Sequence, residues 1–237
     1  MQAGLSVYLD LLRWIAAIMV VAGHLLTHPY WVGVPVPGID FHNDAVIIFF
    51  VISEFVIAYV TQTRERQFGH YFCARLARLW SVAVPAIMLT ILCDAIGLAL
   101  RPQAYWFAPP DFLSVAVNAV FSALFANQFY LLDTPFQPGS NLPYWSMSYE
   151  FAYYLLFGVV FLTRSVRRWF WAALIVYLIG YRIVLLLPIW LAGVLVWRLR
   201  DCPLPSMMGW ALTVVPVLLY GNAQRLPLQS DSLGEMV

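Results

Sequence analysis

The sequence contains no lysine and few charges of either sign. All thirteen basic residues are arginine, twelve residues are acidic, and charged residues make up only 11% of the 237 residues. Hydrophobic residues make up 62%, and the mean hydropathy is +0.78. Because a water-soluble domain of this length does not need so much apolar surface, the composition excludes that class and predicts an all-α, polytopic transmembrane helical bundle. The net charge of +1 gives no indication of nucleic-acid binding.

Cysteine is also scarce. Cys73, Cys93 and Cys202 are an odd number and lie within or beside apolar stretches, so we expect neither a disulfide framework nor a metal site. The amino terminus lacks the basic region and the cleavage site of a secretory signal. The first apolar stretch is therefore expected to be a retained membrane span.

Apolar stretches long enough to enter a membrane recur along the chain, and about seven or eight membrane segments are expected. The candidate spans are Leu9–Leu26, Ala45–Val60, Leu79–Leu100, Tyr144–Leu162, Trp169–Gly180, Ile183–Trp197 and Met207–Tyr220. The stretch Trp169–Trp197 is too long for one span and contains Arg182, so we divide it at Gly180–Tyr181 into two of these spans. A further segment, Phe112–Leu132, is long enough but carries Asn118, Asn127 and Gln128.

The placement of arginine predicts the orientation. The loop after the second span is predicted to be cytoplasmic because it is bordered by Arg64, Arg66, Arg75 and Arg78. The loop Thr27–Asp44 has no arginine and is predicted to lie outside, which places the amino terminus inside. The triplet Arg164, Arg167 and Arg168 should also be cytoplasmic, which conflicts with a full crossing by Phe112–Leu132. A re-entrant or interfacial segment there removes the conflict, and we prefer it.

Arg13 and His24 both lie in the first apolar stretch. Ionisable side chains at membrane depth are costly, about 2.5–3.5 kcal/mol for arginine on insertion scales, so they are functional candidates. A separation of eleven residues places both on one face of a helix, with a rise of about 16 Å between them. Taken singly, Arg13 is explained by snorkelling and His24 by a satisfied position in a helical core. Their shared face weakens that explanation.

Two more arginines, Arg75 and Arg78, are three residues apart at the predicted inner end of the third span. With Arg13 they could clamp an anionic ligand, because a guanidinium presents a planar fork that suits phosphate oxygens. The positive-inside rule alone also predicts arginine at this place, and without other information it explains the pair better.

Acidic residues offer possible partners for these cations. Glu150 follows Trp145, Ser146 and Ser148 at the start of a span and approaches from the same side as His24. A carboxylate near an imidazole can fix its tautomer and stabilise its protonated form. A glutamate favoured by the helix dipole and a serine cap explains the position equally well.

Glu54, within the second span, must be protonated or paired, and we expect an arginine near the inner face to pair with it.

Together these stretches resemble the acyltransferase 3 family of bacterial integral-membrane O-acyltransferases. The stretch Leu9–Ala17, which contains Asp10 and Arg13 and is followed by His24, is similar to the opening motif of that family. The stretch Phe49–Ser53 is similar to its second-span motif, and Arg75 to Arg78 resembles its paired arginines. Trp145, Ser146 and Ser148 with Glu150 resemble its Trp-Ser-x-Ser-x-Glu element.

The resemblance implies transfer of an acyl group, often acetyl, from cytoplasmic acyl-CoA to a hydroxyl of a cell-envelope glycan such as exopolysaccharide or lipopolysaccharide. Arg13, Arg75 and Arg78 would hold the CoA phosphates, and His24 would be the general base, with Glu150 orienting it or balancing its charge. Acyl-CoA would be a donor substrate rather than a bound cofactor. The expected partners are the bilayer, acyl-CoA and the glycan, in a multi-pass protein of the bacterial inner membrane.

Two departures from the family pattern leave alternatives open. The family normally has glycine where this chain has Glu54, and it runs to roughly ten spans. We therefore expect residues 1–237 to form one membrane-embedded domain from which the carboxyl-terminal part of the family fold is missing. An inactive truncated homologue is one alternative. A transporter of glycolipid or acyl groups is another, although no inverted repeat is visible. Acceptor specificity is expected in the outward loops Thr27–Asp44 and Arg101–Asp111.

Overall fold

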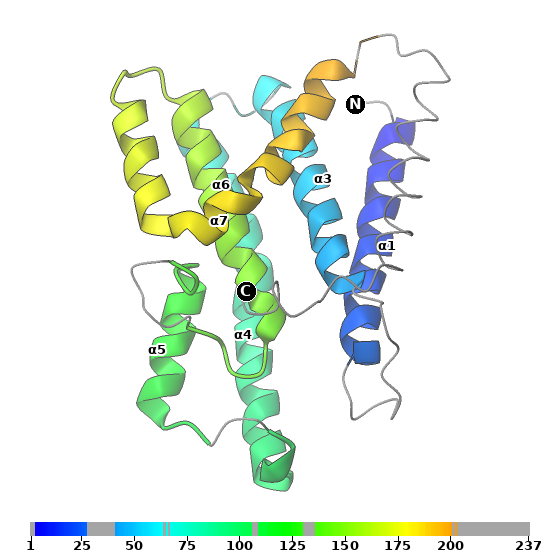
Figure 1. Cartoon of the computed structure of the whole chain (residues 1–237), viewed down its shortest axis with the longest axis vertical. Helices are drawn as coiled ribbons and strands as arrows, with labels where there is room; N and C mark the ends of the chain where they lie inside the picture. The colour runs from blue at the N-terminus through cyan, green and yellow to red at the C-terminus, as the bar shows by residue number, and fades with distance from the viewer. Residues whose placement is uncertain are drawn as a thin grey trace, which may run out of the picture. The chain divides into compact units, whose positions relative to one another are not determined.

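A computed structural model describes residues 3–27, 41–63, 65, 67–105, 109–129, 136–200 and 202. Every regular element within these ranges is helical (Figure 1). The long helices are α1 (Ala3–Thr27), α3 (Phe41–Thr63), α4 (Phe68–Leu100), α5 (Phe112–Ala123), α6 (Trp145–Phe157) and α7 (Arg168–Leu199). Two short 3-10 turns, η1 (Pro102–Ala104) and η2 (Leu142–Tyr144), and a π-helical turn, η3 (Gly158–Leu162), complete the set.

Five helical segments within the described ranges are long and apolar enough to cross a membrane: Gly4–His24, Ala45–Gln62, Phe68–Leu100, Leu142–Leu162 and Arg168–Leu199. Many large apolar side chains on these segments are exposed, among them Trp14, Met88 and Leu185. Exposed apolar surface on this scale needs lipid to cover it. The predicted all-α membrane bundle is confirmed. The predicted span Met207–Tyr220 lies outside the described residues.

The chain divides into two compact units, each described here by itself. The first unit contains Met1–Tyr59 and Ile189–Val237, and the second contains Val60–Pro188. In the first unit α1, α3 and the end of α7 share an apolar core. Leu9, Ile52, Phe55, Ala58 and Trp197 are its buried members. The Trp197 ring meets Phe55 edge to face, with 5.5 Å between the ring centroids.

In the second unit α4 and α6 run in opposite directions. The Tyr71 hydroxyl donates a 3.2 Å hydrogen bond to the main-chain oxygen of Tyr154, and the rings of Phe72 and Phe151 lie 6.1 Å apart. The end of α6 and the turn η3 therefore lie beside the start of α4. Arg164, Arg167 and Arg168, which follow η3, consequently belong to the same end of this unit as Arg75 and Arg78.

The short helix α5 explains how that arrangement is reached. It has twelve residues, a length of about 18 Å, which is less than the roughly 30 Å of a bilayer core. Asp111 caps its first turn by accepting a 2.7 Å bond from the Ser114 amide, and hydrogen bonding to Ser114 lowers the pKa of Asp111. Its last residue, Ala123, accepts a 2.8 Å bond from the Trp80 indole, near the middle of α4.

After α5 the chain returns to the end of α4 from which α5 started. The amide of Ser140 bonds the carboxylate of Asp94, close to the carboxyl end of α4. The segment that begins at Phe112 thus enters and leaves this unit at one end, as the re-entrant alternative predicts. A full crossing is not needed, and the conflict over the arginine triplet disappears.

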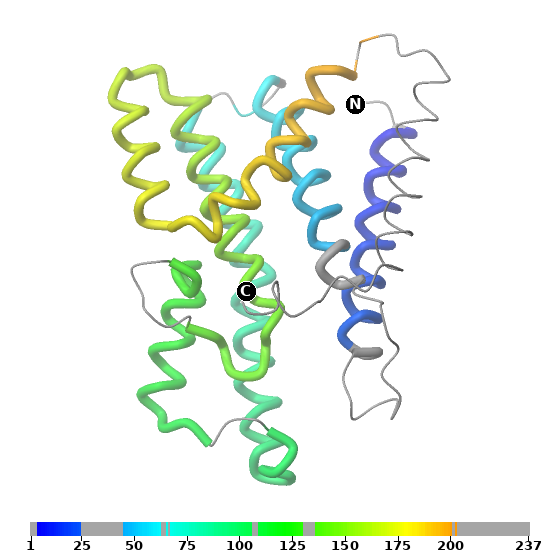
Figure 2. The backbone as a smooth tube through the Cα atoms, viewed as in Figure 1, coloured from blue at the N-terminus to red at the C-terminus, as the bar shows by residue number. Residues whose placement is uncertain are grey.

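The helix α7 is interrupted at the predicted place. Gly180 has φ 79° and ψ 173°, a conformation that only glycine adopts readily, and the chain turns there (Figure 2). The first part of α7 is therefore twelve residues long, too short to cross a bilayer in full. The division at Gly180–Tyr181 is confirmed.

Candidate active site

Arg13 and His24 lie on one unbroken helix, α1, as the spacing predicts. Both side chains are half-buried. They lie on the side of α1 that also carries the buried residues Leu9, Ala16 and Gly23, while the opposite side carries exposed apolar residues. The rise between them is about 16 Å. Neither residue therefore faces outward with the exposed apolar side chains, and a functional pair on this helix face remains a prediction that the burial pattern favours.

The opening motif contains an internal ion pair. Arg13 Nη1 lies 3.2 Å from Asp10 Oδ1, one turn earlier on α1. The Asp10 side chain is 68% exposed, so this ion pair contributes little to stability.

The second-span motif lies in a closely packed part of the first unit. Ser53 and Glu54 on α3 are both buried, Glu54 completely. A Cβ on Gly193 of α7 would lie 2.4 Å from the Val51 oxygen and 2.8 Å from the Glu54 Cβ. The close helix approach that the family glycine would permit on α3 is therefore provided here by a glycine on α7. The expected pairing of Glu54 with an arginine stays a prediction.

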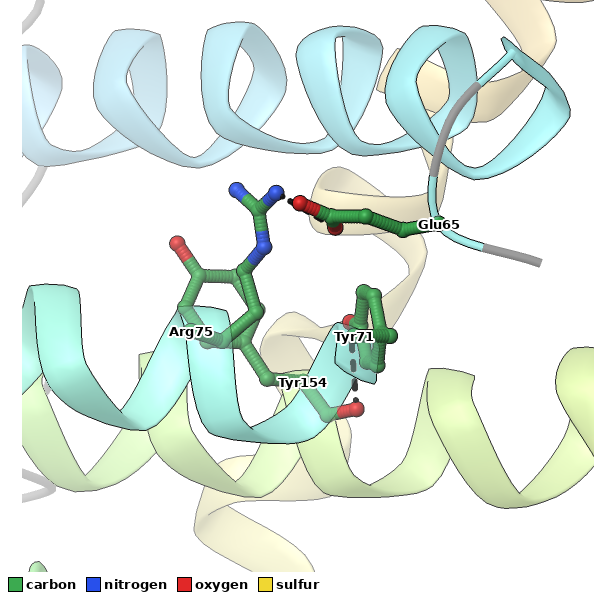
Figure 3. A network of polar contacts seen from close by, with 4 residues as sticks. All are labelled: Glu65, Tyr71, Arg75 and Tyr154. Carbon is green, nitrogen blue, oxygen red and sulfur yellow. Dashed lines mark hydrogen bonds and ion pairs between the residues drawn. The ribbon is translucent and has the colours of Figure 1, made fainter. Parts of the chain in front are cut away.

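Arg75 is buried and already paired. Its Nη2 donates a 2.8 Å bond to Glu65 Oε2, and its guanidinium lies 5.8 Å from the centre of the Tyr71 ring. Figure 3 shows this network, in which Tyr71 also reaches the main chain of Tyr154 on α6. Arg75 on α4 thus holds the short connection between α3 and α4, which contains Glu65, and this is a structural role. It can serve a phosphate only by leaving Glu65.

Arg78 has different surroundings, although it lies only one turn further along α4. Its side chain is exposed, and it makes no ion pair within the part of the chain that the structure describes. Of the two arginines, Arg78 is therefore the one available to an anionic ligand. The predicted pair consists of one structural and one accessible cation.

The Trp-Ser-x-Ser-x-Glu element forms the first turns of α6. The Ser146 hydroxyl donates locally to the Pro143 oxygen at 3.1 Å, and the rings of Trp145 and Tyr149 meet edge to face. Further along the helix, the Tyr154 hydroxyl donates a hydrogen bond to Glu150 Oε1. Glu150 is half-buried in the second unit, whereas His24 belongs to the first. Their pairing stays a prediction.

Ser148 connects this element to the re-entrant segment. Its hydroxyl donates to Asn127 Oδ1, and both side chains are completely buried. The Asn127 Nδ2 atom has no hydrogen-bond partner among the described residues. Just before it, buried Phe125 has φ 57°, an uncommon and strained conformation for a bulky residue. The tip of the re-entrant segment is thus held in a fixed, strained form beside the family motif.

A second polar group, which the motifs do not indicate, lies at the other end of α4. Asp94 is buried, and its carboxylate accepts two bonds from Ser140, one from the amide at 2.8 Å and one from the hydroxyl at 2.6 Å. Partial burial and this carboxylate raise the pKa of Tyr105. An acidic residue inside the apolar stretch Leu79–Leu100 is the same signal that identified Arg13, and it could have been found in the same way.

The fold and these residues define a class: a polytopic helical membrane protein with arginine gathered at one end of α4 and a buried carboxylate near the other. The chain matches the family model described as "Acyltransferase domain", the acyltransferase 3 family, over residues 6–222. It belongs to that family, and the resemblance seen in the motifs is confirmed.

A curated relative is similar over part of its length. The chain is 28% identical over 173 residues to acyltransferase MdmB of Streptomyces mycarofaciens, an alignment that covers 68% of this chain. The alignment covers 41% of that relative, so the chain spans about two-fifths of its length. No solved structure matches the chain.

Proposed function

We propose that the protein is an integral-membrane O-acyltransferase. It moves an acyl group, which we expect to be acetyl, from cytoplasmic acyl-CoA to a hydroxyl of an extracytoplasmic glycan. Membership of the acyltransferase 3 family supports the reaction class. The observation that carries the proposal is the placement of Arg13 and His24 on the half-buried side of one unbroken helix. A cation and a potential base are thereby separated by about half the thickness of a bilayer core.

In the proposed reaction His24 accepts the proton of the acceptor hydroxyl. The oxygen attacks the thioester carbonyl carbon, the carbon–sulfur bond breaks, and the CoA sulfur leaves with the proton that the imidazolium returns. An ester and free CoA thiol result, so atoms and charges balance. Glu150 would orient the imidazole or balance its charge, which is the usual part of a carboxylate in such pairs.

The CoA phosphates would lie at the arginine end of α4. Arg78 is the best placed ligand on the second unit because it is exposed and carries no ion pair with a described residue. Arg13 is the other expected phosphate ligand, and its ion pair with exposed Asp10 contributes little to stability. In this proposal the protein is multi-pass in the bacterial inner membrane, with a cytoplasmic amino terminus.

Purified protein in lipid nanodiscs, given radiolabelled acetyl-CoA and envelope glycan, tests the proposal. We expect His24→Ala to slow transfer by about 100-fold or more, the usual contribution of a general base, while CoA binding is retained. His70→Ala is the matched control, because His70 is exposed at the start of α4 and has no part in the proposed site. Transfer by His24→Ala at the wild-type rate would remove His24 from the mechanism.

The same assay separates the alternatives. The interrupted helix α7 is the one observation that favours a transporter, since transporters use discontinuous helices. A transporter would move labelled glycolipid across a vesicle membrane without consuming acyl-CoA. An inactive homologue would do neither, and would gain nothing from Glu54→Gly, the substitution that restores the family residue.

A further inference from the structure

A cavity of about 660 Å³ lies at the carboxyl end of α4. Its lining residues come from α4, α5, Pro109 and Pro110, and the segment before α6, all of which belong to the second unit. Among the described residues, the polar side chains that line it are Asp94, Asn118 and Gln137, and the remaining lining is mainly aliphatic. Figure 1 shows α4 and α5, the two helices that contribute most of these residues. A volume of this size, with apolar walls and a few convergent polar groups, is typical of a small-molecule site.

The carboxylate in this cavity is held in a fixed position. Both of its oxygens accept hydrogen bonds from Ser140. The side-chain amide of the neighbouring Asn141 donates a 3.2 Å hydrogen bond to the Thr90 hydroxyl. Gly139 has φ 57°, and a Cβ there would lie 1.9 Å from Asp94 Oδ2. The segment can therefore approach Asp94 only because residue 139 is glycine. A charge that is buried and fixed in this way is costly unless its remaining lone pairs are used.

The lining selects the chemistry of a ligand. A carboxylate can accept about four hydrogen bonds, and Asp94 accepts two from Ser140 and one from the Tyr105 side chain, so about one position is left for a ligand hydroxyl. The amides of Asn118 and Gln137 can each donate and accept, as hydroxyl groups also do. Since no basic side chain lines the cavity within the described ranges, an anionic ligand would be repelled by the Asp94 carboxylate. The cavity therefore suits a neutral ring that carries several hydroxyls.

The cavity and the arginines Arg75 and Arg78 lie towards opposite ends of α4. Asp94 follows Arg78 by 16 residues on α4, a rise of about 24 Å, so the two lie near opposite ends of this membrane-spanning helix. We propose that this cavity is the acceptor site and that it binds a neutral saccharide unit through Asp94, Asn118 and Gln137. This inference rests on the proposed function, in which the donor phosphates bind at the arginine end.

Saturation-transfer NMR on the full chain in nanodiscs tests the proposal, with methyl β-glucopyranoside as the neutral probe and glucuronate as the anionic one. We expect transfer to the glucoside and none to glucuronate. Asp94→Asn should weaken glucoside binding by about tenfold or more, because a hydrogen bond to a charged acceptor is lost. Cys93→Ala is the control, since Cys93 precedes Asp94 on α4 but is exposed and does not line the cavity.

Ala119→Phe is the second variant, in case Asp94→Asn fails to fold. Ala119 lines the cavity from α5, and a phenyl ring there would fill much of the space. This variant should lose glucoside binding but keep acetyl-CoA binding. Absence of glucoside binding by the wild type, equal binding by the Ala119→Phe variant, or equal binding of glucuronate would each overturn the proposal.

The acyl-transfer assay distinguishes the two proposals. Undiminished transfer to the glycan by both Asp94→Asn and Ala119→Phe would overturn the acceptor site and leave the proposed function standing. Glucoside binding that these variants abolish, in a protein that never consumes acetyl-CoA, would support the saccharide site and overturn the acyltransferase.

Discussion

Arg75 and Arg78 lie one turn apart on α4, and the structure predicts that replacing each by methionine has a different effect. Arg78 is exposed and makes no ion pair with a described residue, so Arg78→Met should change the free energy of unfolding by no more than about 0.5 kcal/mol. If its guanidinium holds a CoA phosphate, the variant loses a charged hydrogen bond of about 1.5–3 kcal/mol. The Kd for CoA should then rise by roughly 10- to 150-fold.

Arg75→Met should act mainly on stability. The substitution leaves the Glu65 carboxylate without its 2.8 Å partner. Breaking a fully buried pair costs about 3–5 kcal/mol, and because the Glu65 side chain is 21% exposed we expect about 1–3 kcal/mol here. Replacing Glu65 by methionine as well should recover most of the loss, since no unpaired charge remains.

Isothermal titration of CoA and thermal unfolding in nanodiscs measure the two effects separately. Arg101→Met is the matched control, because Arg101 is exposed at the other end of α4. Two results would refute the reasoning: an Arg78→Met variant that binds CoA as tightly as Arg101→Met, or an Arg75→Met variant that unfolds at the wild-type temperature.

Three further predictions concern packing and capping. Gly193→Leu should lower the unfolding temperature sharply, because a Cβ at residue 193 would lie 2.4 Å from the Val51 oxygen. Gly69→Ala should leave the unfolding temperature unchanged, because a Cβ at residue 69 would have no heavy atom within 4 Å. Equal unfolding temperatures of the two variants would contradict this. Ser148→Ala should destabilise by about 1–3 kcal/mol through the buried Asn127 amide, and Ser146→Ala by less, as denaturant titration would measure. Hydrogen bonding to Ser114 lowers the pKa of Asp111, so its cap stabilises α5 fully at pH values above the ordinary carboxyl pKa. This stabilisation is lost as the pH falls through the lowered pKa that Asp111 has in the folded protein. The protection factor of the α5 amides, which corrects hydrogen exchange for its intrinsic slowing at low pH, should therefore fall on acidification, and an unchanged protection factor would count against the cap.

Much of the fold could be predicted because its signals are local. Long apolar stretches predict spans, and Gly180 beside Arg182 predicts the interruption in α7. The arginine triplet predicts that Phe112–Leu132 does not cross fully, and the chain path through Ala123 and Ser140 agrees. These inferences needed only polarity and charge along the chain.

The site could be predicted only in part, because contacts between distant segments leave no local mark. Nothing in the spacing of Arg75 and Arg78 indicates that Glu65 forms an ion pair with Arg75 or that Arg78 is exposed. The bond between Ser148 and Asn127 joins segments 21 residues apart. The expectation that the loop Arg101–Asp111 contributes to specificity stays a prediction. Pro109 and Pro110 of this loop line the cavity, and residues 106–108 lie outside the described ranges.

The proposed mechanism requires His24 and Glu150 to act together as base and orienting carboxylate. A double-mutant cycle on kcat/KM for acetyl transfer, with His24→Ala, Glu150→Gln and the double variant, measures this coupling. We expect strong coupling, with the double variant no slower than His24→Ala alone. Independent effects that multiply in the double variant would show that the two residues do not act as a pair.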